Sequence, residues 1–478
     1  METKYEVTIG LEVHAELKTK TKMFCDSIND ADEVNPNVNV CPVCVAHPGT
    51  LPVINKEAVR HVLRVGTALG ARLADYTEFD RKNYFYPDLP KGYQLSQYEY
   101  PLVSGGVLNG IAITRIHLEE DTASSIHSDS DGSTLIDYNR AGVPLMELVT
   151  EPVIHSAEEA GNFGRELQLL LRYLGASDAD MEKGHMRLEA NISISQTETL
   201  GTKVEVKNIN SFRAMERAVE YEIKRQTELL NKGEKVTQET RGWDENKQVT
   251  FAQRIKEGSA DYRYFPDPDL PALKLSELGL TTDSFKNELP ELPWERRARY
   301  QELGLNAQDA DLYVKNLSLG EFFESVLKEL GDDREIARLA SNYIANDLVN
   351  IIRDSNKLYT EIKDNIGISA INFVKIIQFV KSKKISSRSA KEILAESISS
   401  GQDPEKIAKN KNLFQETSIS AIRDTVNRII QENESVVSEY VRGKESALEY
   451  LVGQAMKLLR GAADAQSIRD LIRETLKK

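Results

Sequence analysis

Residues 5–17, YEVTIGLEVHAEL, carry ionisable side chains at alternate positions toward the end of the segment. In an extended strand, Glu12, His14 and Glu16 lie on one face, and apolar residues such as Val13 lie on the other. Glu12 and His14 are then about 7 Å apart along the strand. Two carboxylates flanking an imidazole can converge on one cation or phosphate. The alternative is an ordinary charged strand face, although strands are poor in acidic residues.

Four further segments show the same alternation: ITRIHLEED at 113–121, PLMELVTE at 144–151, MRLEANISI at 186–194 and KVEVK at 203–207. Their polar faces carry Arg115, His117, Glu119 and Asp121; Glu147 and Glu151; Arg187, Glu189, Asn191 and Ser193; and Lys203, Glu205 and Lys207. Like charges opposed across strands cost stability unless a ligand offsets them. Carboxylates suit Mg²⁺, and Arg and Lys suit phosphate oxygens, so the pattern predicts a nucleotide site among exposed carboxylates on one sheet face.

The sheet that positions these side chains needs helices on its apolar face. Apolar periodicity predicts helices at 56–69, behind the cap Asn55, at 157–174 and at 214–230. A Ser156/Glu159 capping box opens the second of these helices, and Gly175 closes it. The sequence has no GxxxxGK[ST], GxGxxG or HExxH motif, which argues against P-loop, Rossmann and zincin sites. We therefore expect an α+β layer with an antiparallel sheet.

Three cysteines, Cys25, Cys41 and Cys44, lie between the first strand and the first helix. They could supply three of the four ligands that a structural zinc takes. His47 and Asp26 are candidates for the fourth ligand. A site that binds no metal fits equally well, because an isolated cysteine also behaves as a small buried hydrophobe.

Residues 79–100, FDRKNYFYPDLPKGYQLSQYEY, are rich in tyrosine, proline and cations. Their periodicity fits neither a helix nor a strand, so we expect an ordered loop. Aromatic rings interleaved with cations can stack on a base and neutralise a phosphate. A tyrosine-rich loop that only packs against its surroundings is the equal alternative.

The composition bounds the class of protein. With 478 residues, 40% of them hydrophobic, and a net charge of −14, the chain can fold into several domains and is not built to coat nucleic acid non-specifically. Its apolar runs are too short to span a membrane and no signal-peptide pattern is present, so we expect a cytoplasmic protein. Fourteen of the fifteen prolines and all seven histidines lie at or before residue 293. Helical periodicity at 319–330, 337–352 and 419–430 predicts an all-α remainder after a boundary at 287–294, with a join near 399–404.

Several long stretches closely resemble one family: YEVTIGLEVHAEL, FDRKNYFYPDLPKGYQLSQ, RIHLEEDTASSIH, YNRAGVPLMELVTEP, KVEVKNINSF, GSADYRYFPDPDLP and LVGQAMKLLRGAAD. They are similar to the B subunit of the tRNA-dependent Asp/Glu amidotransferase, and the resemblance covers essentially the whole chain. It implies a cradle domain at 1–293, similar in fold to glutamine synthetase and the guanidino kinases. A helical domain at 294–404 and a small helical tail at 405–478 that contacts tRNA are also implied.

The resemblance also implies an activity. In that family the cradle binds ATP and Mg²⁺, phosphorylates the side-chain carboxylate of Glu-tRNA(Gln) or Asp-tRNA(Asn), and lets ammonia displace the phosphate. His14, Glu119 and Glu147 match the Mg²⁺ ligands, with Glu12 and Glu120 as neighbouring catalytic residues. The residues that match the ATP and substrate pocket are Lys82, Asn83, Arg187, Lys207, Asn208, Asn210 and Ser211. Such phosphoryl transfer needs positioning and charge neutralisation rather than a covalent protein nucleophile.

Nothing in the sequence suits glutamine hydrolysis, so a separate amidase subunit is expected. The resemblance implies a heterotrimer of this chain, that amidase subunit and a small bridging subunit. Many family members carry CxC where this chain has Cys25, Asp26 and Ser27, which leaves zinc in question. The tail at 441–478 has eight Lys or Arg against five Asp or Glu, an excess that fits tRNA contact or a solvated bundle. Two other functions fit the same residues: a free-standing ligase that forms an acyl phosphate on a small acid, and a non-catalytic tRNA-binding adaptor.

Overall fold

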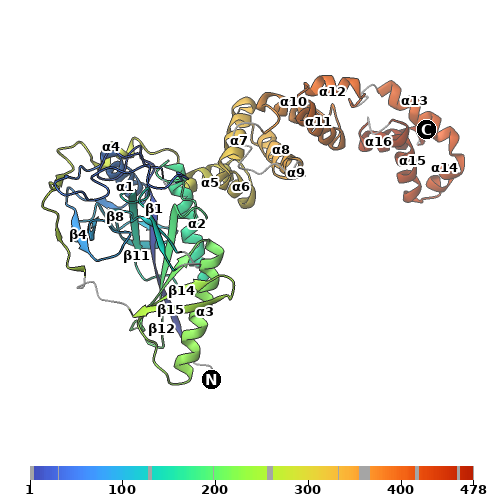
Figure 1. Ribbon diagram of the computed structural model, residues 1–478. Helices are drawn as coiled ribbons and strands as arrows, with labels where there is room; N and C mark the ends of the chain where they lie inside the picture. The colour runs from blue at the N-terminus through green and yellow to red at the C-terminus, as the bar shows by residue number, and fades with distance from the viewer. Residues whose placement is uncertain are drawn as a thin grey trace. The chain divides into compact units, whose positions relative to one another are not determined.

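The computed structural model describes residues 5–30, 32–127, 132–197, 199–255, 262–331, 333–354, 366–414, 419–459 and 463–476. The chain divides into two compact units, Met1–Pro293 and Trp294–Lys478. The first unit is built around a large sheet and the second from helices (Figure 1). Residues 258–261, which begin the family motif GSADYRYFPDPDLP, and residues 460–462 of LVGQAMKLLRGAAD lie outside the described ranges.

The strands and helices of the first unit account for about half of its residues. In chain order they are β1 (Glu6–Glu16), α1 (Lys56–Ala68), β2 (Arg72–Leu73), β3 (Tyr76–Thr77), β4 (Asp80–Asn83), β5 (Tyr93–Ser96), β6 (Val103–Ser104), β7 (Val107–Leu108), β8 (Ile111–Glu120), β9 (Ser124–His127), β10 (Thr134–Asp137), β11 (Pro144–Thr150), α2 (Ala157–Tyr173), β12 (Met186–Ser195), β13 (Val204–Ile209), α3 (Phe212–Asn231), β14 (Glu239–Asp244), β15 (Val249–Ile255), β16 (Phe265–Pro266), β17 (Leu273–Lys274) and α4 (Thr282–Lys286). The five strands predicted from alternation are β1, β8, β11, β12 and β13, and all five are confirmed.

The main sheet has the strand order β15-β14-β13-β12-β1-β11-β8-β6-β2, with β7 also paired to β8. Every pair in it is antiparallel except β13 with β14. The opening strand β1 lies between β11 and β12, and the register places His14 opposite Glu147 on one side and Arg187 on the other. Because side chains alternate across a pleated sheet, this register gathers the polar positions of neighbouring strands on one face.

Helices cover the apolar face of the sheet. Helix α3 packs against β12, β13 and β15, and α2 packs against α3, as Figure 1 shows along one side of the sheet. Gly164 of α2 permits this close packing, because a Cβ atom there would lie 2.9 Å from the Leu188 side chain of β12. The side chain of Ser156 caps α2, but Glu159 accepts from the backbone of His155 rather than of Ser156. The predicted capping box is therefore only half formed.

The expectation of a loop at 79–100 is wrong in part. Strands β4 and β5 pair as an antiparallel hairpin, and β16 adds a third strand to β4. Each of these strands has four residues or fewer. Segments this short carry too few alternations to register as strands, and their pairing with β16 depends on contacts far along the chain.

The second unit is helical throughout its described residues, as predicted. Its elements are α5 (Pro293–Glu302), α6 (Ala307–Lys315), α7 (Leu317–Leu330), α8 (Arg334–Asn342), the π-helical turn η2 (Tyr343–Leu348), α9 (Val349–Asp354), α10 (Ala370–Lys381), α11 (Ser387–Ser400), α12 (Pro404–Asn410), α13 (Ile419–Glu432), α14 (Glu434–Val441), α15 (Glu445–Leu458) and α16 (Ala465–Leu476). Helix α12 packs against α10 and α11, and Lys375 pairs with Asp403 at its start. The join predicted between residues 404 and 405 therefore falls inside a group of packed helices.

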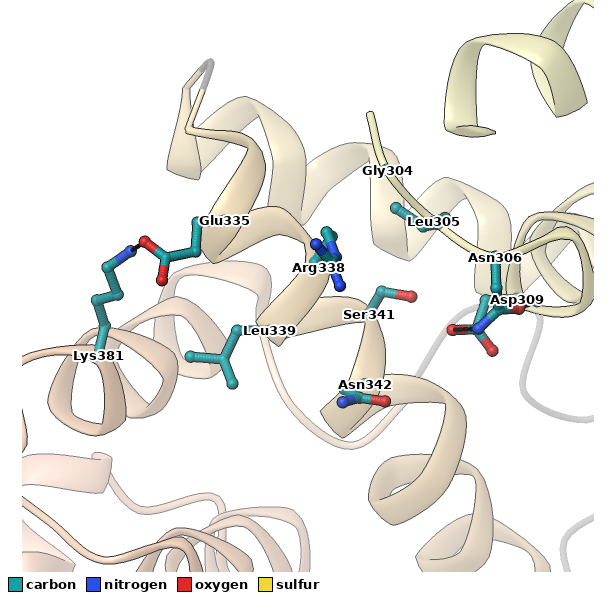
Figure 2. Close-up of a pocket in the computed structure, with 10 residues that line it drawn as sticks. All are labelled: Gly304, Leu305, Asn306, Asp309, Glu335, Arg338, Leu339, Ser341, Asn342 and Lys381. Carbon is teal, nitrogen blue, oxygen red and sulfur yellow. Dashed lines mark hydrogen bonds and ion pairs between the residues drawn. The ribbon is translucent and has the colours of Figure 1, made fainter. Parts of the chain in front are cut away.

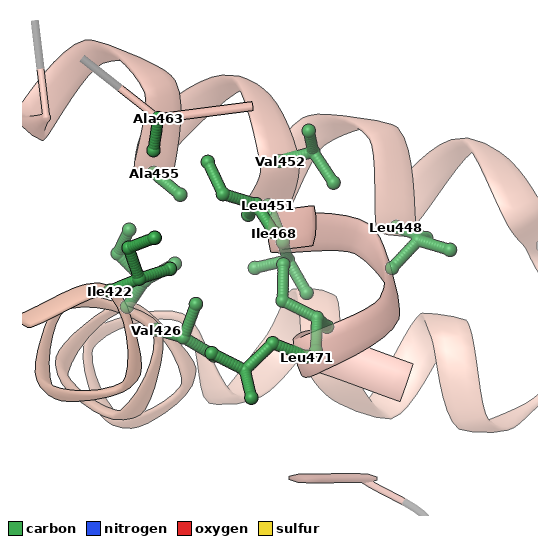
Figure 3. Packing of buried hydrophobic residues seen from close by; sticks show 11 residues of the cluster. Ile422, Val426, Leu448, Leu451, Val452, Ala455, Ala463, Ile468 and Leu471 are labelled. Carbon is green, nitrogen blue, oxygen red and sulfur yellow. The ribbon is translucent and has the colours of Figure 1, made fainter. Parts of the chain in front are cut away.

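The last helices enclose a core of their own. Buried residues from α13, α15 and α16 form it, among them Val426, Leu451 and Ile468 (Figure 3).

Among the described residues, none of the helices is both long enough and apolar enough to cross a bilayer.

Candidate active site

Three neighbouring strands bring together an imidazole and two carboxylates. His14 of β1, Glu147 of β11 and Glu119 of β8 each offer a ligand atom, and these atoms all lie within 4.8 Å of one another. The His14 Nε2 atom is 3.3 Å from Glu147 Oε2 and 3.6 Å from Glu119 Oε1. We call these three residues the carboxylate site. Their ligand atoms are close enough to share one cation.

Both carboxylates of the site are buried, contrary to the exposed face that the alternation predicts. Glu119 is 2% exposed and Glu147 is 6% exposed. Strand β5 packs against β8, and its Ser96 hydroxyl donates a hydrogen bond of 3.2 Å to Glu119. Charges held this far from water are costly unless a partner or a metal compensates them.

The protonation of His14 reflects this crowding. Burial alone would lower the pKa of His14, but its hydrogen bond to Glu147 and the charges of Glu147, Glu119 and Glu12 raise that pKa to about 9. Burial lowers the pKa of His117 to about 4, so the His117 ring is neutral at pH 7. Without a cation, protonated His14 is therefore a positive partner of Glu147, together with Arg115, whose guanidinium donates to the other oxygen of Glu147 at 3.4 Å.

Lys82 of β4 supplies a further positive charge beside the site. Burial disfavours the charged form of Lys82, but Glu119 and Glu147 outweigh burial and hold its pKa above the usual value. Burial also raises the pKa of Glu119. Burial likewise opposes ionisation of Glu147, but the neighbouring His117, His14 and Lys82 hold the pKa of Glu147 well below the usual value. The arrangement places a lysine next to the two carboxylates, as a site for a metal–phosphate complex requires.

A second donor group adjoins the first. Glu12, His14 and Glu189 also place their ligand atoms within 4.8 Å of one another. Burial, together with the charges of Glu147 and Glu189, raises the pKa of Glu12 to about 7. Lys207 of β13 pairs with Glu189 at 2.8 Å. The polar face therefore continues from β11 across β1 and β12 to β13.

An arginine cluster lies at the other end of the same face. Arg187 donates to Asp121 at 2.6 Å, and Arg140 lies 3.7 Å from the same carboxylate. Burial, and then repulsion from Asp121, raise the pKa of the neighbouring Glu16 to about 8. Arg187, Asn208 and Asn210 line one pocket of about 300 Å³. Three residues predicted for the substrate pocket are thus brought together.

Three residues that were predicted for the catalytic site or the substrate pocket lie elsewhere in the structure. Glu120 points away from the carboxylate site, where it pairs with Lys91 and accepts from the Leu95 backbone at 2.9 Å. The Asn83 amide donates to backbone carbonyls, including that of Arg263 at 2.9 Å. The Ser211 hydroxyl caps α3 by accepting from the Ala214 backbone. Asn83 and Ser211 position backbone, and Glu120 braces the β4–β5 hairpin from the side opposite Glu119.

Other residues at the site were not predicted as functional. His117 lies 3.5 Å from Glu147, and Asp121 anchors Arg187. The alternation of β8 had already placed both on the polar face, so a signal for them existed. Tyr262 and Tyr264 contact the rings of the hairpin. Alternation did not mark them, and their sequence signal was their place in the family motif GSADYRYFPDPDLP.

The cysteines also meet in space. Cys25, Cys41 and Cys44 place their sulfurs within 4.8 Å of one another, and neither His47 nor Asp26 completes that set among the described residues. Ser27 Oγ is 3.7 Å from the Cys44 sulfur. Burial lowers the pKa of the adjacent Lys22, and its amine donates to the Tyr138 carbonyl.

The helical unit has a pocket of about 510 Å³ between the start of α6, α8 and the end of α10. Figure 2 shows Glu335 and Lys381, which form an ion pair, at one side of it, with Asn306 and Asp309 at the other. Most of its polar lining residues are exposed, and the buried one, Ser341, pairs with the Tyr313 hydroxyl, so the pocket lacks the buried carboxylates that converge at the carboxylate site.

Comparison with known proteins shows the protein family to which this chain belongs. A family described as "GatB/GatE catalytic domain" matches residues 7–280, and one described as "GatB domain" matches residues 321–476. Relatives named as the B subunit of aspartyl/glutamyl-tRNA(Asn/Gln) amidotransferase align over nearly their whole length. The protein of Crocosphaera subtropica is 42% identical over 100% of this chain and 98% of its own. That of Carboxydothermus hydrogenoformans is 41% identical over 99% of each chain. The chain therefore belongs to the family of Asp/Glu-tRNA(Asn/Gln) amidotransferase B subunits, which confirms the resemblance of its motifs.

Proposed function

We propose that this chain activates the side-chain carboxylate of Glu-tRNA(Gln), Asp-tRNA(Asn) or both by ATP-dependent phosphorylation, and then converts it to the amide with ammonia. The observation that carries the proposal is the convergence of His14, Glu119 and Glu147 on the polar face of the sheet, beside Lys82. Family membership supports the overall reaction. The likeness of the cradle to glutamine synthetase and the guanidino kinases remains a prediction.

The donor set fits Mg²⁺. Glu119 and Glu147 would hold this ion through the hard carboxylate oxygens that it prefers, and His14 would add an imidazole nitrogen. Bound there with ATP, Mg²⁺ would neutralise charge on the phosphates. Because an imidazole ligand must be neutral, loading the site requires His14 to release its proton.

The chain's own residues then divide the work. His14, Glu119 and Glu147 would hold the metal, and Lys82 would stabilise charge on the transferred phosphoryl group. Glu189 belongs with Glu12 and His14 to the adjoining donor group and also lines the pocket at Arg187. Burial beneath the β4–β5 hairpin limits water at the reacting carboxylate, which protects an acyl phosphate from hydrolysis.

Ammonia has to come from a partner. The relatives are named as one subunit of an amidotransferase, which supports assembly of this chain with an amidase subunit and a small bridging subunit. Three thiols and Ser27 would give a zinc ion at most an incomplete protein shell, so we assign zinc no part in the reaction.

Glu147→Gln tests the proposal. Assembled with its partner subunits, this variant should lose ATP-dependent amidation by at least about 100-fold, since a buried charged ligand is lost. Glu151→Gln is the matched control, because Glu151 lies just beyond the same strand and bonds to Thr114 at the surface. Normal amidation by Glu147→Gln would favour the non-catalytic adaptor. Amide formation on a small free acid by the chain alone, with glutamine as donor, would favour the free-standing ligase.

A further inference from the structure

Five tyrosine rings form a continuous row on the β4–β5 hairpin and the segment that leads into β16. The ring centroids of Tyr86 and Tyr84 are 5.9 Å apart, and Tyr84 lies 6.0 Å from Tyr262. Tyr262 lies 6.1 Å from Tyr264, which stacks on Tyr98 at 4.4 Å. We call this set the tyrosine row. No other part of the proposed reaction uses these rings.

The backbone holds the row in place. The Asn83 side chain donates to the carbonyl of Tyr262, so it ties the 262–264 segment to the hairpin. Two turns follow Tyr86, in which the Leu89 backbone donates to Tyr86 and the Gly92 backbone donates to Leu89. Leu89 is itself buried. A surface fixed in this way loses little entropy when it binds a ligand.

The two ends of the row are open to solvent. Tyr86 is 55% exposed and Tyr98 is 50% exposed, and the neighbouring Phe85 is 80% exposed. Rings needed only for packing would be covered, whereas about half or more of each of these three side chains is in contact with solvent.

The row also adjoins the carboxylate site. The Lys82 ammonium is 5.2 Å from the ring centroid of Tyr262. Its charge interacts with Tyr84 and Tyr264 on one side and with Glu119 and Glu147 on the other. A ligand lying along the rings would therefore end beside Lys82, next to the buried carboxylates of the carboxylate site.

We infer that the tyrosine row stacks the unpaired nucleotides at the 3′ end of the tRNA, so that the aminoacyl group they carry enters the carboxylate site beside Lys82. The inference rests on the proposed function. Every base has a π face, so stacking on rings binds single strands without reading their sequence. A chain with a net charge of −14 cannot rely on general attraction to phosphates. Aromatic stacking supplies a local contact that this charge does not oppose.

The test measures binding of uncharged tRNA, intact or lacking its last three nucleotides, to the full-length chain. Tyr86→Ala/Tyr98→Ala removes the two exposed rings, and Tyr86→Phe/Tyr98→Phe keeps them. Tyr76→Ala is the matched control, because Tyr76 is similarly exposed and pairs with Tyr100 outside the row. Circular dichroism and thermal unfolding show that each variant is folded, and Tyr86→Ala alone serves if the double variant is not.

Truncated tRNA should bind more weakly than intact tRNA to the wild-type chain, to Tyr86→Phe/Tyr98→Phe and to Tyr76→Ala. The Ala variant should bind intact tRNA about 5- to 100-fold more weakly per stacking ring lost and no longer distinguish the two tRNAs. The inference would be overturned if the Ala variant bound intact tRNA as tightly as wild type, or if it still bound the truncated tRNA more weakly than the intact one. Amidation by the assembled wild type would then still support the proposed function. Unchanged tRNA affinity with weaker co-purification of the amidase subunit would instead assign the row to a protein partner. Failure of the proposed function itself would appear as absent amidation by the assembled wild type.

Discussion

Replacing Glu147 by Gln should move the pKa of His14 by more than two units in metal-free protein. The pKa of His14 is about 9 against a usual value of 6.5, and at about 1.4 kcal/mol per unit the shift corresponds to roughly 3 kcal/mol. Glu147 provides both the hydrogen bond and the largest favourable charge. Once Glu147 is neutral, burial dominates, and the pKa of His14 should fall to about 6.5 or below.

The raised pKa of His14 also makes the stability of the fold depend on pH. A histidine whose folded pKa is raised contributes stability that is complete below about pH 6.5 and is lost as the pH rises through about 9. NMR titration of the imidazole protons in chelator-treated protein measures the shift, with the His14 signal identified by its loss in His14→Gln. Glu151→Gln should leave the pKa near 9. If Glu147→Gln kept a His14 pKa near 9, the electrostatic account of the carboxylate site would be refuted.

Three further predictions concern other parts of the chain. Ser27→Cys should raise zinc affinity, because its side chain lies 3.7 Å from the Cys44 sulfur and would supply a fourth thiolate; unchanged zinc content by mass spectrometry would contradict this. Leu451→Ala should lower the free energy of unfolding of the tail by about 2–5 kcal/mol in urea, since Leu451 is fully buried, whereas exposed Val441→Ala should change it by less than about 0.5 kcal/mol. Asn83→Ala should raise the KM for tRNA about fivefold with kcat nearly unchanged, because hydrogen bonds of about 1 kcal/mol each no longer hold the tyrosine row; a fall in kcat alone would place Asn83 in the chemistry instead.

Local alternation was enough to predict the strands that carry the site. It assigned His14, Glu119 and Glu147 to one face because a strand's side-chain period does not depend on distant contacts. The same rule separates Glu120 from Glu119, since adjacent residues face opposite ways, and applying it would have removed Glu120 from the predicted site. Family resemblance, rather than periodicity, selected the three donors among the many charged residues of that face.

The covering of the site could not be predicted in the same way. The β4–β5 hairpin covers Glu119 with short strands whose third partner, β16, is distant in the chain. The burial of Glu119 therefore depends on tertiary pairing. Sequence periodicity carries no information about such contacts, so the face was expected to be open to solvent.

The central position of β1 also bears on how the sheet assembles. A slip of one residue between β1 and either neighbour would turn Glu12, His14 and Glu16 toward the apolar face beneath the helices. Burying those charges without partners costs several kcal/mol each, far more than a misaligned backbone ladder could recover. The residues proposed to hold the metal therefore also act during folding, because they make strand registers shifted by an odd number of residues unstable before any substrate binds.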